Sequence, residues 1–139
     1  MKQRIILSHD IEAEIAEAIS ECEHDRLFVL TDETTRDLCW PRIKDFLSLK
    51  NANVITIKAG DTNKNIDSTI SVWHSLQDGG ATRHSCLINL GGGMVTDLGG
   101  FAASTFKRGI DFINIPTTLL AMVDASVGGK TGVNFGGLK

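Results

Sequence analysis

The chain has 139 residues, with 17 acidic and 14 basic side chains and a formal net charge of -3. This length suits one domain with a sizeable core, and the scattering of both charge signs gives no basic face, so we expect no nucleic-acid partner. No apolar run approaches the ~18 residues of a membrane helix, and residues 1–4 lead into a strand-like run rather than a secretory segment, which predicts a cytoplasmic protein without a membrane partner.

Five short apolar runs have the length and composition of buried strands. They are rich in Ile, Val, Leu and Phe and lie at residues 4–7, 27–30, 54–57, 86–90 and 112–115. Between them, apolar residues recur at steps of three to four, which places one apolar stripe on each of three predicted helices. The stripes are Ile11-Ile15-Ala18-Ile19-Cys22, Leu38-Ile43-Phe46-Leu47 and Ile66-Ile70-Trp73-Leu76.

The alternation of strands and helices predicts an α/β fold, a Rossmann-like parallel sheet with helices on both faces, formed by one domain over residues 1–139. Ligands bind such sheets at the carboxyl ends of the strands. A run of three glycines, Gly91-Gly92-Gly93, follows the fourth predicted strand at such an end. We therefore expect the ligand site beside this run.

The glycine run has a phosphate-binding and a purely structural interpretation. Glycines between a strand and a helix let the backbone approach a ligand, and the free N–H groups of the first helical turn can bind a pyrophosphate. The fingerprint Gly-x-Gly-x-x-Gly is not met, because Thr96 stands at its third glycine, so a simple tight turn is the alternative. Asp97 is either a ligand contact or a carboxylate that favours the helix dipole.

Two basic motifs follow. Gly129-Lys130-Thr131 resembles the end of a P-loop, but Asp124 stands where the first glycine of that motif belongs, which disfavours an ATPase. Lys107-Arg108-Gly109 lies between a predicted helix and a strand, and on sequence alone a solvated turn is its first interpretation. An arginine fork also suits a phosphate group, to which it makes two charge-assisted bonds.

Neither the cysteines nor the histidines have the spacing of a metal site. The three cysteines are far apart and contain no Cys-x-x-Cys pair, so we expect buried, reduced thiols, and the four histidines match no ligand pattern. The sequence thus predicts no metal ligands in this chain.

Four blocks of the last third of the chain, in order and spacing, closely resemble the N-terminal half of dehydroquinate synthases. The blocks cover residues 91–97, 108–112, 115–121 and 123–134. The resemblance implies the N-terminal domain of the dehydroquinate synthase-like fold, with bound NAD. In similar enzymes the NAD contacts fall on the positions that are here Gly91, Gly92, Gly93, Met94, Val95, Asp97, Thr117 and Thr118.

The resemblance also implies which residues face the substrate. Lys130 would lie near its charged groups and also contact the cofactor, Asp124 would lie in a polar network with the cofactor, and Lys139 would lie at the same site, in contact with cofactor and substrate. Arg108 would reach the substrate phosphate, commonly across the interface of a homodimer. Thr117 and Thr118 follow Pro116, so helix capping is a compatible second role for them.

The upstream resemblance is thinner. Asp32 follows the second predicted strand, where the family places an aspartate that binds the adenosine ribose, and Thr34 replaces the asparagine that often follows it. Residues 60–64 resemble a Gly-Glu-x-x-Lys block that also holds the nucleotide. Here Asp61 replaces the glutamate with a shorter side chain, and Lys64 matches.

The implied enzyme is 3-dehydroquinate synthase of the shikimate pathway and aromatic amino acid biosynthesis, a lyase. It converts 3-deoxy-D-arabino-heptulosonate 7-phosphate, a phosphorylated sugar acid, to 3-dehydroquinate with elimination of phosphate. In the family a divalent metal, zinc or cobalt, is held by a glutamate and two histidines of a helical C-terminal domain. Because the chain stops in a glycine-rich loop, we expect a truncated sequence that lacks this domain and is inactive by itself.

Two alternatives stay open. The first is another enzyme of the same fold, either a different sugar phosphate cyclase or a metal-dependent alcohol dehydrogenase such as glycerol dehydrogenase. The second is a stand-alone nucleotide-binding module without catalysis.

Overall fold

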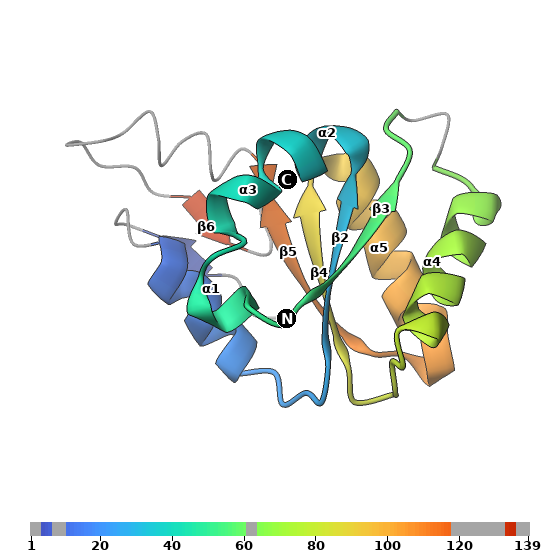
Figure 1. Ribbon diagram of the computed structural model, residues 1–139, viewed down its shortest axis with the longest axis horizontal. Coiled ribbons are helices and arrows are strands. Elements are labelled where there is room, and N and C mark those ends of the chain that lie inside the picture. Colours follow the sequence, from blue (N-terminus) through green and yellow to red (C-terminus); the bar gives the residue numbers. More distant parts are fainter. Residues whose placement is uncertain (1–3, 7–10, 61–63, 118–132, 136–139) are drawn as a thin grey trace.

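The computed structural model describes residues 4–6, 11–60, 64–117 and 133–135. Four parallel strands form its central sheet, in the order β3-β2-β4-β5 (Figure 1). Their bounds are β2 (Leu27–Asp32), β3 (Asn53–Ile57), β4 (Cys86–Gly91) and β5 (Asp111–Pro116). The predicted parallel sheet is confirmed, and each of these four strands contains the apolar run predicted for it.

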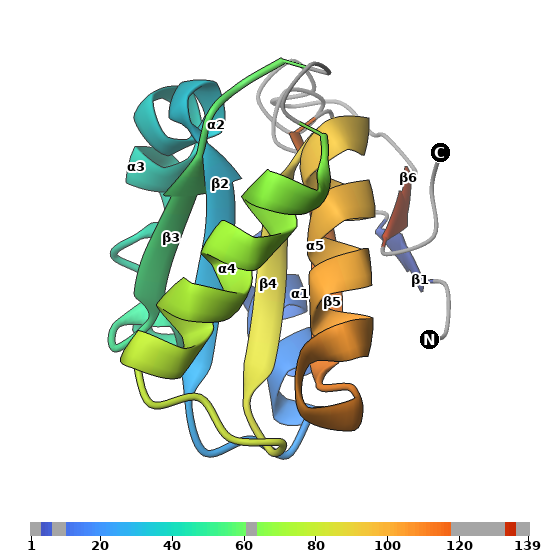
Figure 2. The same cartoon turned by 90° about the vertical axis from the view of Figure 1, so that its right-hand side faces the viewer.

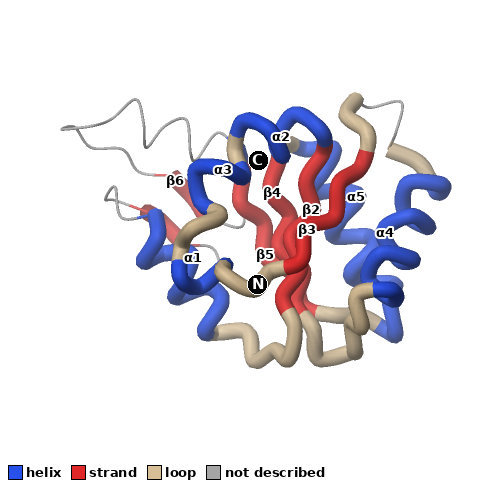
Figure 3. The backbone as a smooth tube through the Cα atoms, in the orientation of Figure 1, coloured by secondary structure: helices blue, strands red, loops and turns tan. Residues whose placement is uncertain are grey.

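Helices cover both faces of this sheet (Figures 2 and 3). One face carries α1 (Ile11–Ser20), α3 (Trp40–Ile43) and the short 3-10 turn η1 (Leu47–Leu49). The other carries α4 (Ile66–Asp78) and α5 (Gly93–Thr105), followed by the 3-10 turn η3 (Phe106–Arg108). In the part of the chain that is described, no helix is long and apolar enough to span a bilayer.

The two central strands contribute to both cores, because successive side chains of a strand point to opposite faces. From β4, Ile88 and Leu90 pack under α1, whereas Leu87 packs under α5, and all three are fully buried. From β2, Val29 and Phe28 divide in the same way. Strands buried on both faces read as continuous apolar runs, which is why the sequence pattern located them well.

The first predicted strand does not join the parallel sheet. β1 (Arg4–Ile6) pairs antiparallel with β6 (Val133–Phe135), and this small ribbon lies outside the four-stranded sheet, beyond β5 (Figure 2). Membership of β1 in the β-α repeat was therefore a wrong expectation. The partner lies more than a hundred residues away in the sequence, so no local pattern indicates the pairing.

The stripe predicted as one helix over residues 38–47 is also wrong, since the chain forms α2 (Glu33–Leu38), α3 and η1 there. Pro41 has no N–H to continue the hydrogen-bond ladder of α2, and it occupies the first turn of α3 instead. As a result Ile43 is buried, whereas Leu38 is 68% exposed.

The third predicted helix forms, but only part of its predicted apolar stripe is buried. α4 forms as predicted and buries Leu76, but its buried face runs through Thr69 and Val72, and Ile66 and Ile70 are exposed. Two of the four predicted core positions of this helix thus face outward.

Candidate functional site at the carboxyl edge of the sheet

The sheet register brings the predicted ligand residues of four strands to one edge. Asp32 at the end of β2 pairs with Ile57 at the end of β3, and Gly91 at the end of β4 pairs with Pro116 at the end of β5. Loops and helix starts that follow these strands therefore meet at the carboxyl edge, where α/β sheets bind their ligands.

The three glycines of the run differ in their surroundings. Gly91 is buried, and a Cβ at this position would lie 2.7 Å from the Cβ of Val95, too close for any real pair of carbons. At Gly92 and Gly93, by contrast, an added Cβ would meet no atom within 4 Å in the described structure. Gly91 is thus required by packing, whereas the space over Gly92 and Gly93 is open to a ligand.

The beginning of α5 fits a phosphate group. Its N-cap is Gly92, and no side chain caps the first turn, so the early N–H groups face the open space over the glycines. Thr96 donates its hydroxyl to the carbonyl oxygens of Gly92 and Gly93, both at 3.2 Å. The residue that breaks the dinucleotide fingerprint therefore holds the loop carbonyls, while no side chain caps the amides of the first turn.

Lys64 and Asp97, 33 residues apart in the sequence, form an ion pair at 2.8 Å. Lys64 stands just before α4, whose N-cap Asn65 accepts a hydrogen bond from the Ser68 amide, and Asp97 lies in the second turn of α5. Both side chains are about half exposed, so the pair lies at the surface and can still contact a ligand. The structure thus brings together two residues that the resemblance assigned to the nucleotide.

A pocket of about 320 Å³ lies beside this ion pair. Its walls are largely apolar, with Ile66 from α4 and Leu98 and Phe101 from α5. Ile66 and Phe101 are both more than half exposed. Sequence analysis missed Phe101 and assigned Ile66 to the core, because an apolar residue on a helix gives no signal that distinguishes a pocket wall from a core position.

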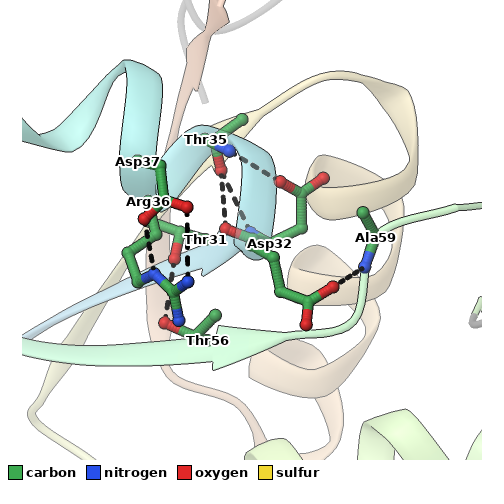
Figure 4. A network of polar contacts seen from close by, with 8 residues as sticks. Thr31, Asp32, Thr35, Arg36, Asp37, Thr56 and Ala59 are labelled. Atoms are coloured by element: carbon green, nitrogen blue, oxygen red, sulfur yellow. Dashed lines mark hydrogen bonds and ion pairs between the residues drawn. The ribbon is translucent and has the colours of Figure 1, made fainter.

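Asp32 is engaged in the structure as a helix cap (Figure 4). Its Oδ1 accepts a hydrogen bond from the Thr35 amide at 2.7 Å, and the Thr35 hydroxyl accepts one from the Asp32 amide at 3.0 Å. Next to it, Glu33 Oε1 accepts a bond from the Ala59 amide at 3.3 Å, which ties α2 to the end of β3. Capping fixes Asp32 at the carboxyl edge, where the prediction placed the ribose, and Thr34 is exposed nearby.

Not every predicted site residue can be placed. Thr117 directly follows β5 and is half-buried beside the end of β4, and Met94 is half-buried in the first turn of α5. Val95 is buried, so only its backbone is open to a ligand. Five further residues lie outside the described ranges: Asp61, Thr118, Asp124, Lys130 and Lys139.

Arg108 does not join this site within one chain. It lies exposed in η3 at the far end of α5, and α5 runs along the sheet from the carboxyl edge to the opposite edge (Figure 2). Thirteen helical residues separate the two ends, roughly 20 Å at 1.5 Å per residue. Arg108 and Lys107 both have positive φ, at 70° and 47°, before Gly109 at 108°. Within one chain, Arg108 therefore lies at the opposite end of α5 from the glycine run.

The described residues offer no metal centre. Among residues 4–6, 11–60, 64–117 and 133–135, no group of three His, Cys, Asp or Glu side chains could hold an ion. The donor set of a divalent metal is therefore not found in this part of the chain.

The family model described as the N-terminal region of 3-dehydroquinate synthase matches residues 54–139. A 3-dehydroquinate synthase of Parabacteroides distasonis is 49% identical over 138 residues, which cover 99% of this chain and 39% of that protein. The chain thus spans about two fifths of the length of this relative.

Two solved structures share the fold. A 2-epi-5-epi-valiolone synthase from Streptomyces hygroscopicus with NAD+ and Zn2+ bound is 30% identical, with a TM-score of 0.64, over 84% of this chain and 33% of its own. A 2-deoxy-scyllo-inosose synthase gives a TM-score of 0.70 at 23% identity, over 91% of this chain and 38% of its own. The second likeness concerns the fold alone.

Proposed function

This chain belongs to the 3-dehydroquinate synthase family, and from that premise we propose that the full-length protein is an NAD-dependent 3-dehydroquinate synthase. Its substrate would be 3-deoxy-D-arabino-heptulosonate 7-phosphate, and its products 3-dehydroquinate and inorganic phosphate. The observation that supports this most strongly is the 49% identity to a 3-dehydroquinate synthase over nearly the whole chain.

In this proposal the residues of the carboxyl edge hold the cofactor. The uncapped amides at the start of α5 bind the pyrophosphate over Gly92 and Gly93, where no Cβ obstructs the approach. Lys64 contributes a positive charge to the same site, and Asp97 holds Lys64 in place through their ion pair. The bound cofactor would supply a reversible hydride acceptor for a secondary alcohol of the substrate.

The substrate phosphate would be bound by a second copy of the chain. We assign this contact to Arg108 of that copy, because the arginine lies at the opposite end of α5 from the glycines of its own chain. The working protein would then be a homodimer with two sites, each built from both copies. Asp124, Lys130 and Lys139 stay predictions for the remaining contacts to substrate and cofactor.

We assign the divalent metal to residues other than those that the structure describes. The described residues contain no donor set for it, and the relative from Parabacteroides is more than twice as long as this chain. None of the described residues is therefore proposed to bind the metal.

The test is a turnover assay on the full-length protein with NAD and zinc or cobalt. A 3-dehydroquinate synthase releases one phosphate for each 3-dehydroquinate formed, and no NADH accumulates, because the hydride returns to the product. Accumulation of NADH would identify an alcohol dehydrogenase instead, and NAD binding without turnover would identify a nucleotide-binding module.

A second candidate is a related sugar phosphate cyclase with another substrate. The solved 2-epi-5-epi-valiolone synthase favours it, because its fold and 30% identity extend over most of this chain. Parallel assays with heptose phosphates that lack the carboxylate separate the two candidates. Faster phosphate release from such a substrate than from the heptulosonate phosphate would replace the first candidate by the second.

A further inference from the structure

Two thiols lie against each other at the edge of the sheet opposite the glycine run. Cys86 is the first residue of β4, Cys22 follows α1 closely, and their Sγ atoms are 3.4 Å apart although 64 residues separate them in the sequence. Asp111, the first residue of β5, has its Oδ2 3.4 Å from the Cys22 Sγ. The proposed cofactor site lies at the other end of β4 and uses neither thiol.

The two thiols differ in access and in ionisation. Cys86 is fully buried, whereas Cys22 is only partly buried, so a reagent from solvent meets Cys22 first. The hydrogen bond between the sulfur atoms lowers the pKa of Cys22, and it raises the pKa of Cys86 together with burial. Since the thiolate is the nucleophile in thiol chemistry, Cys22 is also the first of the two to react.

We propose that Cys22 and Cys86 form a reversible intramolecular disulfide, with Cys22 as the attacking thiol and Cys86 as the resolving thiol. The oxidant is a low-molecular-weight disulfide, RSSR. The Cys22 thiolate displaces one RS group as thiolate and forms a mixed disulfide, and the Cys86 sulfur then attacks Cys22, loses its proton and releases the second RS group. Two thiols and one RSSR thus give one protein disulfide and two RSH.

The geometry requires little movement. A disulfide bond joins sulfur atoms at about 2.05 Å, so the two sulfurs approach by roughly 1.4 Å. Cys22 lies just beyond the last residue of α1, and its amide donates to the Ile19 carbonyl at 3.1 Å. The bond would tie α1 to the central strand and restrict the unfolded chain over a long loop, so the oxidised protein should unfold at a higher temperature.

The test uses the full-length protein and oxidised glutathione as the probe. After oxidation, alkylation of free thiols and tryptic digestion, we expect peptide 5–26 joined to peptide 84–107, and a reductant should separate them. Cys39→Ser is the matched control and should leave this product unchanged, because Cys39 has no sulfur partner in the described structure. Cys22→Ser should abolish the product, and Cys86→Ala tests the buried position without adding a polar group.

The Cys22→Ser variant tests the proposal even if a variant of the buried Cys86 fails to fold. In wild-type protein and in Cys39→Ser, oxidation should raise the unfolding temperature by several degrees, and in Cys22→Ser it should not. A stable glutathione adduct on Cys22 with Cys86 still free would overturn the proposal. A joined peptide that forms only after the protein is denatured would overturn it as well.

Discussion

At the scale of single residues, the glycine run shows that one residue type can be required for two reasons. Gly91 has no side chain because Val95 of the following helix occupies the place of a Cβ. Gly92 and Gly93 face open space in the described structure, so packing against the described residues does not explain them. An approach of another molecule to the backbone there gives a physical reason for the missing side chains.

This difference predicts different effects for two matched alanine variants, one on stability and one on NAD binding. Gly91→Ala should lower the free energy of unfolding by about 1–3 kcal/mol, because its Cβ overlaps Val95. Gly93→Ala should keep the stability or raise it by up to about 1 kcal/mol, since the position is helical and alanine is the better helix former, yet it should weaken NAD binding. Chemical denaturation and calorimetry measure the two effects. Unchanged NAD affinity in Gly93→Ala would remove the glycine run from the cofactor site.

Arg108 allows a second test at this scale, with its neighbour as the control. In the full-length enzyme, Arg108→Ala should leave the fold intact and lower kcat/KM by about a hundredfold or more, on the order of 3 kcal/mol, because a charge-assisted phosphate contact is lost. Lys107→Ala removes an equally exposed charge beside it and should leave kinetics near wild type. Steady-state kinetics on both variants measure the difference.

Mixing variants tests where Arg108 acts. Chains with Arg108→Ala, combined with chains inactivated at Lys130, should regain part of the activity through hybrid dimers that contain one intact site. Wild-type kinetics in Arg108→Ala would refute the phosphate role. A dead variant that no mixing rescues would refute only its placement across two copies.

At the scale of elements, the strands were predictable and the helices only in part. β2 and β4 are buried on both faces, and burial of this kind leaves a continuous apolar run in the sequence. The break at Pro41 carried a local signal too, but the apolar spacing around it suggested one helix. The pairing of β1 with β6 and the contact of Lys64 with Asp97 depend on the folded chain, and no local pattern contains them.

The site residues stay predictions. Motif spacing alone left the glycine run ambiguous, and the resemblance to a family suggested a cofactor-binding role for it. The structure added what neither could supply, namely the open space over Gly92 and Gly93 and the apolar pocket with Phe101. It also separated Arg108 from the rest, because a helix places its two ends at opposite edges of the sheet.

The contact of α5 with β4 contains a matched pair of residues. Asn89 is fully buried on β4, and its Nδ2 donates to Asn114 Oδ1 at 3.0 Å. Its Oδ1 has no hydrogen-bond partner in the described structure and lies where a Cβ on Gly99 would be, at 1.9 Å. The helix can therefore approach the strand at this point only because residue 99 is glycine.

A double-mutant cycle tests this pair. Gly99→Ala should destabilise by about 1–3 kcal/mol through overpacking, and Asn89→Ala by about 1 kcal/mol through loss of its hydrogen bond. The double variant should be more stable than Gly99→Ala alone, because alanine at 89 leaves room for the new methyl group and alanine is the better helix former. Denaturation curves of the four proteins give the interaction energy, and simple additivity would contradict the pairing.

At the scale of the whole molecule, the two edges of the sheet have different tasks. At the amino edge, Asp25 accepts hydrogen bonds from the Thr82 and Ser85 hydroxyls, which lower the pKa of its carboxyl and join the loops before β2 and β4. At the carboxyl edge, no side chain caps the first turn of α5 in the described part of the chain. The uncapped start of α5 and the exposed ion pair of Lys64 and Asp97 face outward there.

This division predicts how the chain of 139 residues binds NAD when it is expressed alone. Gly92, Gly93, Lys64 and Asp97 are in place, so the chain should bind, but the nucleotide buries less surface than in the full-length protein, and its affinity should be at least about tenfold lower. Excess NAD should raise the unfolding temperature, because a ligand of the native state stabilises it. Calorimetry and thermal unfolding, on the chain and on the full-length protein, measure both effects.

The control is a second surface ion pair. Lys64→Ala with Asp97→Ala should abolish the thermal shift, whereas Arg36→Ala with Asp37→Ala should preserve it, although that pair is closely matched in distance and exposure. Since exposed pairs contribute about 0–1 kcal/mol, neither double variant should lose its fold, and the difference then reports on binding alone. An equal thermal shift in the two double variants would show that NAD binds elsewhere on the molecule. The carboxyl edge would then no longer be assigned as the cofactor site.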